Sequence, residues 1–357
     1  MKRVWITSVD GYNCIGENVD DIYKRLVQCN FQPRENENCI PNLLAKGDMR
    51  GKDGYSIAGL TVSKMVLEQV DVEAIDTYAI GTVMATEDGA MKTNLKFLKQ
   101  LYEEGTEYVS PKLFSATVSN SCLGSICIKY QLKGPSTMFV NTSPILYGLR
   151  LIESNKAKAV FAAVVDEYDR ELFDDYKSLK ILSEGWKAGA AGIFLESDES
   201  VPITGNQVIG EIVSCSNVID GRQQYRLDEF PIGKQAIERG IIKALDKARI
   251  TIDELACIFT ASNSNSLLYQ YENEVIRSLS KDVKITPLNS HIHMNGLVEG
   301  IIDIGIALKC LKEQRVIYSD SYGKWEQELT SKQYVMVNTL SRDGNWSSII
   351  LRGEKNG

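Results

Sequence analysis

The chain has 357 residues, of which 43% are hydrophobic and 24% are charged, and these values are close to the average for globular proteins. This composition excludes wholesale disorder, and no apolar run reaches the roughly 18 residues that a membrane-spanning helix needs. The 47 acidic residues outnumber the 40 basic residues, which gives a net charge of −7 and excludes a general attraction for nucleic acid. The N-terminal apolar run is too short for a signal peptide, so we expect a cytoplasmic protein.

Strand-like and helix-like segments alternate through the first part of the chain. Runs of apolar residues predict the strands, and apolar residues at helical spacing predict the helices. In chain order we expect a strand at Val4–Val9, a helix at Val19–Cys29, a polar loop at Glu35–Lys52, a helix at Ser56–Val70, a strand at Thr77–Thr86, helices at Asn94–Glu103 and Ala116–Leu132, a strand at Thr137–Asn141, a helix at Ile145–Asn155, and strands at Ala157–Val165 and Ala190–Glu196. Asn18 directly precedes the first helix and is a suitable N-cap residue.

The polar stretch Ser197–Gly205 predicts a boundary between two halves, 1–200 and 201–357, of one compact unit. In the second half we expect a strand at Val208–Cys215, a helix at Lys234–Ala248, a strand at Ala256–Ala261, a helix at Ser266–Leu279, a strand at Val283–Thr286, a helix at Gly296–Leu311, and strands at Tyr334–Asn338 and Ser347–Leu351. Near-continuous apolar strands separated by helices predict an α/β protein whose sheet is covered on both faces. The similar order of elements in the two halves indicates a duplication.

Cysteine and histidine usage restricts the chemistry. None of the eight cysteines forms a CxxC pair, so the spacing predicts neither a zinc site nor a set of disulfides. His291 and His293 are the only histidines, which excludes any mechanism that needs two histidines far apart in the sequence. We predict no metal and no cofactor.

Five segments, spread over nearly the whole chain, carry a resemblance to a known family. They are VWITSVDGYNCIGENVDDIYKRL (4–26), NSCLGSICIKYQLKGPS (120–136), ESNKAKAVFAAVVDEY (153–168), EGWKAGAAGIFLES (184–197) and NGLVEGIIDIGIALKCLKEQ (295–314). In this order they resemble the β-ketoacyl synthases of the thiolase superfamily. The resemblance implies a thiolase-like fold, in which two similar α/β halves form a layered α-β-α-β-α core.

The family's reaction, a decarboxylative condensation, holds the acyl chain as a thioester on a cysteine. The resemblance places that cysteine seven residues after the turn Gly134-Pro135-Ser136, where this chain has Ser143, followed by Pro144. A serine hydroxyl lacks thiolate reactivity unless a base lies next to it. Ser143 is therefore either a structural residue that caps the following helix or a serine nucleophile, and the first reading is favoured.

Three further parts of the family's machinery are altered. Ser262 replaces the first family histidine, and Thr286 replaces the family's lysine. The second family histidine corresponds to His291, which is retained. His291 is either a structural residue or a chemical group, and the same holds for His293. The family's glycine-rich loop near the C-terminus, which supplies an oxyanion donor, corresponds to 341–346 and keeps only one glycine. Four independent changes argue against an alignment error at one position.

Cys122 lies in the run SNSCLGS, which superficially imitates the family's nucleophile motif. The gapless match through Gly134-Pro135-Ser136 places Cys122 one helix too early, in a segment that the family uses at its dimer interface. We therefore interpret it as a buried structural thiol. The same interpretation applies to Cys127, on the same predicted helix.

The preferred hypothesis is a degenerate β-ketoacyl synthase that has no competent condensing site of its own. The resemblance then implies a non-catalytic subunit like the chain-length factors of fatty-acid, polyketide or aryl-polyene biosynthesis. Such a subunit forms a heterodimer with an intact ketosynthase, which receives the acyl carrier protein, and it forms a homodimer in isolation through residues 115–142. We expect no nucleic-acid or membrane partner. Two alternatives remain: an active acyltransferase that uses Ser143 or Cys122 as nucleophile, and a non-enzymatic homodimeric binding protein.

Overall fold

A computed structural model gives the architecture of the protein. It describes residues 2–28, 39–171, 174–175, 188–220, 232–261, 267–287, 296–320, 323–329 and 332–353. The helices are α1 (Val19–Val27), α2 (Lys46–Met49), α3 (Gly54–Leu67), α4 (Met91–Glu104), α5 (Pro111–Ser115), α6 (Asn120–Lys129), α7 (Ile145–Glu153), α9 (Val201–Thr204), α10 (Lys234–Ala248), α11 (Leu267–Leu279) and α12 (Gly296–Glu313). None of the helices in these ranges is long and apolar enough to cross a membrane.

Ten strands of the described chain form one mixed sheet. They are β1 (Val4–Tyr12), β2 (Ile80–Thr86), β3 (Ser136–Val140), β4 (Ala159–Asp166), β5 (Gly189–Ser197), β6 (Gly210–Ile219), β7 (Leu255–Phe259), β8 (Lys284–Thr286), β11 (Tyr334–Leu340) and β12 (Asn345–Gly353). Their order is β3-β2-β4-β5-β1-β6-β12-β11-β7-β8. Strands β9 (Arg315–Asp320) and β10 (Gly323–Glu328) form a separate hairpin.

The strand order repeats in the two halves of the sheet. Read from its edge, the first half runs β3-β2-β4-β5-β1, and the second runs β8-β7-β11-β12-β6. In each half the first three strands are parallel, and the last two pair antiparallel with their neighbours. The halves meet where β1 and β6 pair antiparallel over Val4–Ile6. This repetition of topology supports the duplication that the element order predicts.

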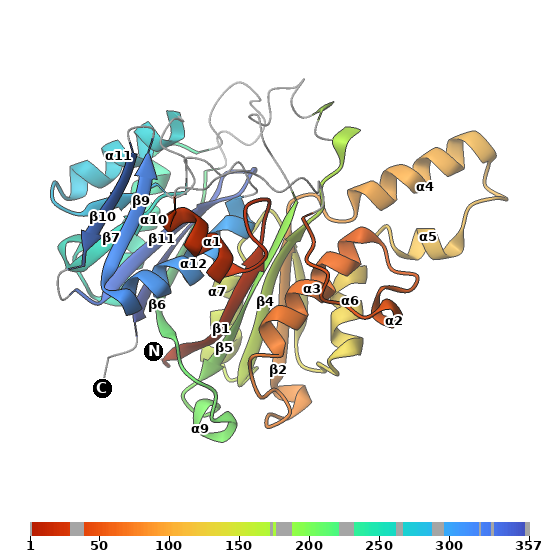
Figure 1. Ribbon diagram of the computed structural model, residues 1–357, viewed down its shortest axis with the longest axis horizontal. Helices are drawn as coiled ribbons and strands as arrows, with labels where there is room; N and C mark the ends of the chain where they lie inside the picture. The colour runs from red at the N-terminus through yellow and green to blue at the C-terminus, as the bar shows by residue number, and fades with distance from the viewer. Residues whose placement is uncertain are drawn as a thin grey trace.

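The helices and the two halves of the sheet build five layers (Figure 1). Helices α3 and α6 cover the outer face of the first half, and α10 and α11 cover the outer face of the second half. Helices α7 and α12 lie between the halves, because both pack against strands of the first and of the second half. The apolar side chains accordingly form three buried clusters, one in the middle and one under each outer layer. The predicted thiolase-like layering is confirmed.

Local sequence signals explain many element boundaries. Asn18 caps α1 as predicted, because its side chain accepts a hydrogen bond of 2.8 Å from the Asp21 backbone. Helix α10 has the predicted limits. The predicted helix Ala116–Leu132 is wrong in its first turn: α5 ends at Ser115, α6 begins at Asn120, and Gln131 with a φ of 54° ends the segment.

Other elements were not predicted, among them the short helices α5 and α9. The loop expected at 35–52 contains the short helix α2, and the hairpin of β9 and β10 follows α12 directly. Both segments are rich in charged and polar residues, so neither shows an apolar run or a clear amphipathic period. Weak apolar patterning therefore explains why α2 and the hairpin were not predicted, whereas α5 and α9 are too short to show a helical period.

Candidate functional site

Ser143, the predicted counterpart of the family's nucleophile, is buried between the end of β3 and the start of α7. Asn141 turns the chain there with a φ of 55°, and its backbone N–H donates to the Thr86 carbonyl oxygen, 2.9 Å away. The N-cap position of α7 falls on Pro144, and no side chain caps the helix. The predicted role of Ser143 as an N-cap is therefore wrong, whereas its place at the head of a central helix is as expected.

The loop between β11 and β12, which the sequence resemblance predicts to be the counterpart of the family's glycine-rich loop, lies directly beside Ser143. The Asn141 side-chain amide donates to Asp343 Oδ2 at 2.6 Å, and Asn345 Nδ2 donates to Thr142 Oγ1 at 2.8 Å. Gly344 has a φ of 79°, so the one retained glycine adopts a left-handed conformation that favours glycine. The structure thus brings together two of the predicted site regions from opposite halves of the chain.

Arg342 of this loop binds the acidic pair that follows β2. Its guanidinium donates to both carboxylate oxygens of Asp88, at 2.7 and 2.9 Å, and one nitrogen lies 3.3 Å from Glu87 Oε2. The Arg342 backbone N–H also donates to Glu87 Oε1 at 3.1 Å. All three side chains are largely buried, so this ion-pair cluster holds the loop against the first half of the protein.

Asp166 supports the same segment from the end of β4. Its carboxylate accepts hydrogen bonds from Thr86 Oγ1 at 2.6 Å and from the backbone N–H groups of Glu87 and Asp88, at 2.9 and 3.1 Å. Burial, with the charges of Asp88 and Glu87 as further causes, raises the pKa of Asp166 to about 8. Burial also raises the pKa of Glu87 to about 7, against the favourable charge of Arg342. The neighbouring Glu167 has its pKa raised to about 7, mainly by burial.

The acidic residues of this cluster were not singled out from the sequence. Glu87 and Asp88 follow a predicted buried strand, and Asp166 and Glu167 follow another. Carboxyl ends of neighbouring parallel strands meet at one edge of a sheet, and β2 and β4 are such neighbours. Two acidic pairs at the ends of two apolar strands were the available signal.

The remaining predicted site residues are in different positions. Ser262, His291 and His293 lie outside the described residues. Thr286 is buried at the end of β8, where its backbone carbonyl accepts a hydrogen bond from Thr260. Over the described ranges, no group of three or more His, Cys, Asp or Glu side chains is arranged to hold a metal ion.

Cys122, the other candidate nucleophile, is fully buried between α6 and α3. Its sulfur lies 3.7 Å from the Tyr55 carbonyl oxygen, and a side chain at Gly59 would collide with it. Burial raises the pKa of the Cys122 thiol well above its ordinary range. A thiol that is buried and protonated at neutral pH is a poor nucleophile, so these contacts favour the structural interpretation.

Comparison with known proteins identifies the architecture. The sequence matches no family model and no curated protein sequence. The fold matches a β-ketoacyl synthase from Burkholderia phymatum STM815 with a TM-score of 0.81 and 17% identity, covering 99% of this chain and 100% of that one. The chain has the thiolase-like fold of the β-ketoacyl synthases.

Two other ketosynthase structures are similar over their full length. The ishigamide ketosynthase/chain length factor has a TM-score of 0.83 at 16% identity, with 99% of both chains covered. AntDE:AntF, a type II polyketide synthase acyl-carrier protein in complex with its ketosynthase bound to the hexaketide, has a TM-score of 0.81 at 14% identity, with 99% of this chain and 100% of that chain covered. The ketosynthase fold is thus retained here although few residues are shared.

Proposed function

We propose that this protein is the non-catalytic, chain-length-factor-like subunit of a heterodimer whose other subunit is an intact ketosynthase. The observation that carries the proposal is the hydrogen bond from the Arg342 backbone N–H to Glu87. Arg342 lies in the loop that corresponds to the family's oxyanion loop. A free backbone N–H is needed there to stabilise a developing oxyanion. In this chain the Glu87 carboxylate already accepts the hydrogen bond of the Arg342 backbone N–H.

The electrostatics of the loop oppose condensation as well. The Arg342 guanidinium is paired with Glu87 and Asp88, so a developing oxyanion would meet carboxylates and a donor that is already engaged rather than unpaired donors. Ser143 adds a hydroxyl where a thiolate is needed. The ketosynthase fold is retained here, although these groups differ from those of the family. This combination is expected of a subunit that forms part of an acyl-binding surface without performing the reaction.

The free edge of the sheet supports assembly with a second subunit. In the described part of the chain β3 pairs only with β2, so its other side is unpaired. Val140 on this edge is 57% exposed, and Ile128 of the neighbouring α6 is 74% exposed. Leu123 and Ile126, which also lie in the predicted dimer region 115–142, are buried within this chain. An unpaired edge flanked by apolar side chains is a hazard that a partner strand removes. The proposed partner strand is the β3 equivalent of an intact ketosynthase or of a second copy.

The proposal is tested by assaying this protein and a ketosynthase from the same gene cluster, separately and together. Each sample receives acyl- and malonyl-loaded acyl carrier protein, and mass spectrometry detects the ketoacyl product. We expect no product from this chain alone and product from the co-purified pair. As a control, replacing the partner's nucleophilic cysteine by alanine should abolish the product of the pair. Product from the isolated chain would instead support the acyltransferase alternative, and failure to co-purify would support the solitary binding protein.

A further inference from the structure

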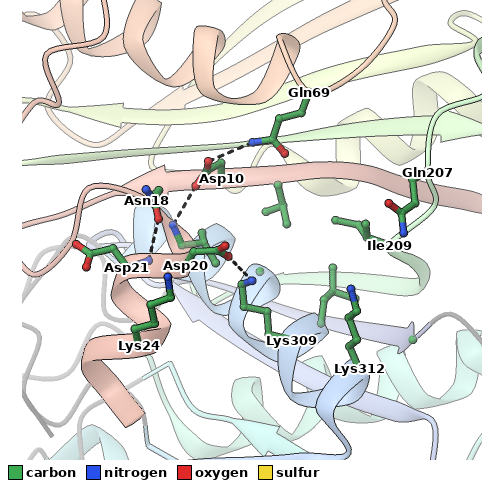
Figure 2. A pocket seen from close by; sticks show the side chains of 15 residues that line it. Asp10, Asn18, Asp20, Asp21, Lys24, Gln69, Gln207, Ile209, Lys309 and Lys312 are labelled. Carbon is green, nitrogen blue, oxygen red and sulfur yellow. Dashed lines mark hydrogen bonds and ion pairs between the residues drawn. The ribbon is translucent and has the colours of Figure 1, made fainter. Parts of the chain in front are cut away.

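A pocket of about 660 Å³ opens at the seam between the two halves of the protein. Strand β1, the first turns of α1, and Gln69 contribute from the first half, whereas Gln207, Ile209 and the C-terminal half of α12 contribute from the second. Figure 2 shows the side chains that line it. The volume is in the range of pockets that hold small organic molecules.

The backbone explains why the pocket forms here. Strands β1 and β6 pair only over Val4–Ile6, so Val9 and Asp10 lie beyond the point where the two strands separate. Helix α12 approaches α1 closely at Gly305, where a side chain would come within 2.9 Å of Val19. The pocket therefore lies between elements fixed by the core rather than between mobile surface loops.

Three lysines and three aspartates line the pocket, so their formal charges cancel, but not all of them are paired with one another. Figure 2 shows the ammonium groups of Lys24, Lys309 and Lys312 along one side. Lys309 forms an ion pair with Asp20 across the gap between α12 and α1. Lys24 and Lys312 form no ion pair with any residue that the structure describes. Two cationic groups are therefore available at the rim.

The other two carboxylates of the pocket are engaged internally. Asp10 accepts hydrogen bonds of 2.9 Å from the backbone N–H groups of Gly11 and Val19, and one of 3.2 Å from the Gln69 side chain. Asp21 accepts a hydrogen bond from Arg25 Nε at 3.3 Å. These donors satisfy both carboxylates, which leaves Lys24 and Lys312 as the cationic side chains of the pocket with which no described carboxylate forms an ion pair.

Part of the pocket lining is apolar. Val9 and Ile209 are half-buried, Leu308 is buried, and all three line the cavity. The amide side chains of Asn18, Gln69 and Gln207 add neutral hydrogen-bonding groups around them. A lining that combines apolar side chains, neutral polar groups and lysines is complementary to a small molecule with an apolar body and an anionic end.

We propose that this pocket binds a small organic anion, with its carboxylate or phosphate on Lys24 or Lys312 and its apolar body on Val9, Ile209 and Leu308. The site is separate from the one that carries the proposed function. Gly296, at the start of α12, abuts Leu340 beside the loop of Arg342. At 1.5 Å per residue, Lys312 lies roughly 24 Å further along the helix. The pocket can therefore bind its ligand whether or not the chain takes part in condensation.

Isothermal titration calorimetry with phenyl phosphate, benzoate and inorganic phosphate tests the proposal on the full-length protein. Phenyl phosphate or benzoate should bind more tightly than inorganic phosphate, and the tighter of the two identifies the anionic group. The double variant Lys24→Gln/Lys312→Gln should weaken this binding about tenfold, a change that corresponds to about 1.4 kcal/mol. The matched control Lys96→Gln/Lys99→Gln removes two positive charges from α4, on the arm that projects away from this pocket (Figure 1), and should bind as the wild type does.

Each result of these titrations either supports or overturns the proposal. Tighter binding of an organic anion that only the pocket variant loses supports the proposal, and circular dichroism of each variant verifies that it is folded. The proposal is overturned if neither organic anion binds, if inorganic phosphate binds equally well, or if both double variants lose affinity alike. None of these results bears on condensation, so failure here is distinct from failure of the proposed function.

Discussion

Arg342 and Asp88 are joined by two parallel hydrogen bonds of 2.7 and 2.9 Å, although 254 residues separate them in the sequence. Their side chains are 16% and 2% exposed. Arg342 belongs to the last hairpin of the sheet, and Asp88 follows β2, so the pair connects the two halves of the protein. A bidentate arginine–carboxylate contact of this kind combines charge with fixed geometry.

Removing the guanidinium should destabilise the fold. Arg342→Gln leaves Glu87 and Asp88 buried without their cation, and loss of one partner of a buried pair typically costs about 3 kcal/mol or more. We expect a clearly lower urea midpoint, measured by circular dichroism. The matched control is Arg315→Gln, whose ion pair with Glu313 is exposed. That substitution should cost less than about 1 kcal/mol. Equal effects of the two variants would contradict the assigned role of Arg342.

The buried carboxylates should make stability depend on pH. The pKa of Asp166 is raised to about 8, so the folded protein holds this proton more tightly than the unfolded chain does. The contribution of Asp166 to the free energy of unfolding is therefore fully present at acidic pH, and it is lost as the pH rises towards 8. Asp166→Asn mimics the protonated form and should flatten this decline, measured as urea midpoints from pH 5 to about 8.

A control variant isolates this effect from a general change of charge. Glu274→Gln removes a carboxylate from the surface, where it pairs with the exposed Lys234, and should leave the decline as steep as in the wild type. An Asp166→Asn protein that lost stability with pH as steeply as the wild type would contradict the location of the proton.

The two cysteines of α6 should differ in reactivity. Cys122 is fully buried with a raised pKa, whereas Cys127 is only partly buried. Iodoacetamide applied to the native protein at neutral pH, followed by peptide mapping, should label Cys127 first and leave Cys122 unmodified until urea unfolds the chain. Faster labelling of Cys122 would revive it as a candidate nucleophile.

The free edge at β3 should be needed for dimer formation. Val140→Glu places a charge on the edge strand and should shift the isolated protein from dimer to monomer in light scattering. Ile203→Glu is the matched control, because Ile203 on α9 is 57% exposed, as Val140 is. A dimer that persists in the Val140 variant would show that the subunits meet through another surface.

Most of the fold could be predicted from the apolar patterning of the sequence. The long buried strands β2, β4 and β5 and the helices around them were predictable, because continuous apolar runs and helical spacing leave few alternatives. The repeated order of elements also indicated the two matching halves. The hairpin of β9 and β10 was missed because its sequence, RVIYSD followed by GKWEQE, includes many charged residues and has no long apolar run.

The site was predictable only in outline. The position of Ser143 and of the loop 341–346 followed from sequence segments, and the structure brings these two regions together. The cluster of Arg342 with Glu87 and Asp88 was not predictable, since no local pattern pairs residues that lie in different halves of the chain. The acidic pairs at the ends of two predicted strands were the sequence signal for its carboxylates, and the structure adds that β2 and β4 are neighbours in the sheet.

The most direct test of the central claim is to map where the acyl group resides in the assembled pair. The co-purified heterodimer is incubated with acyl-loaded carrier protein, quenched in acid, digested and analysed by tandem mass spectrometry. We predict that all of the acyl group is found on the partner's cysteine and none on the peptides that contain Ser143 or Cys122. An acyl group on either of these two residues would contradict a non-catalytic subunit.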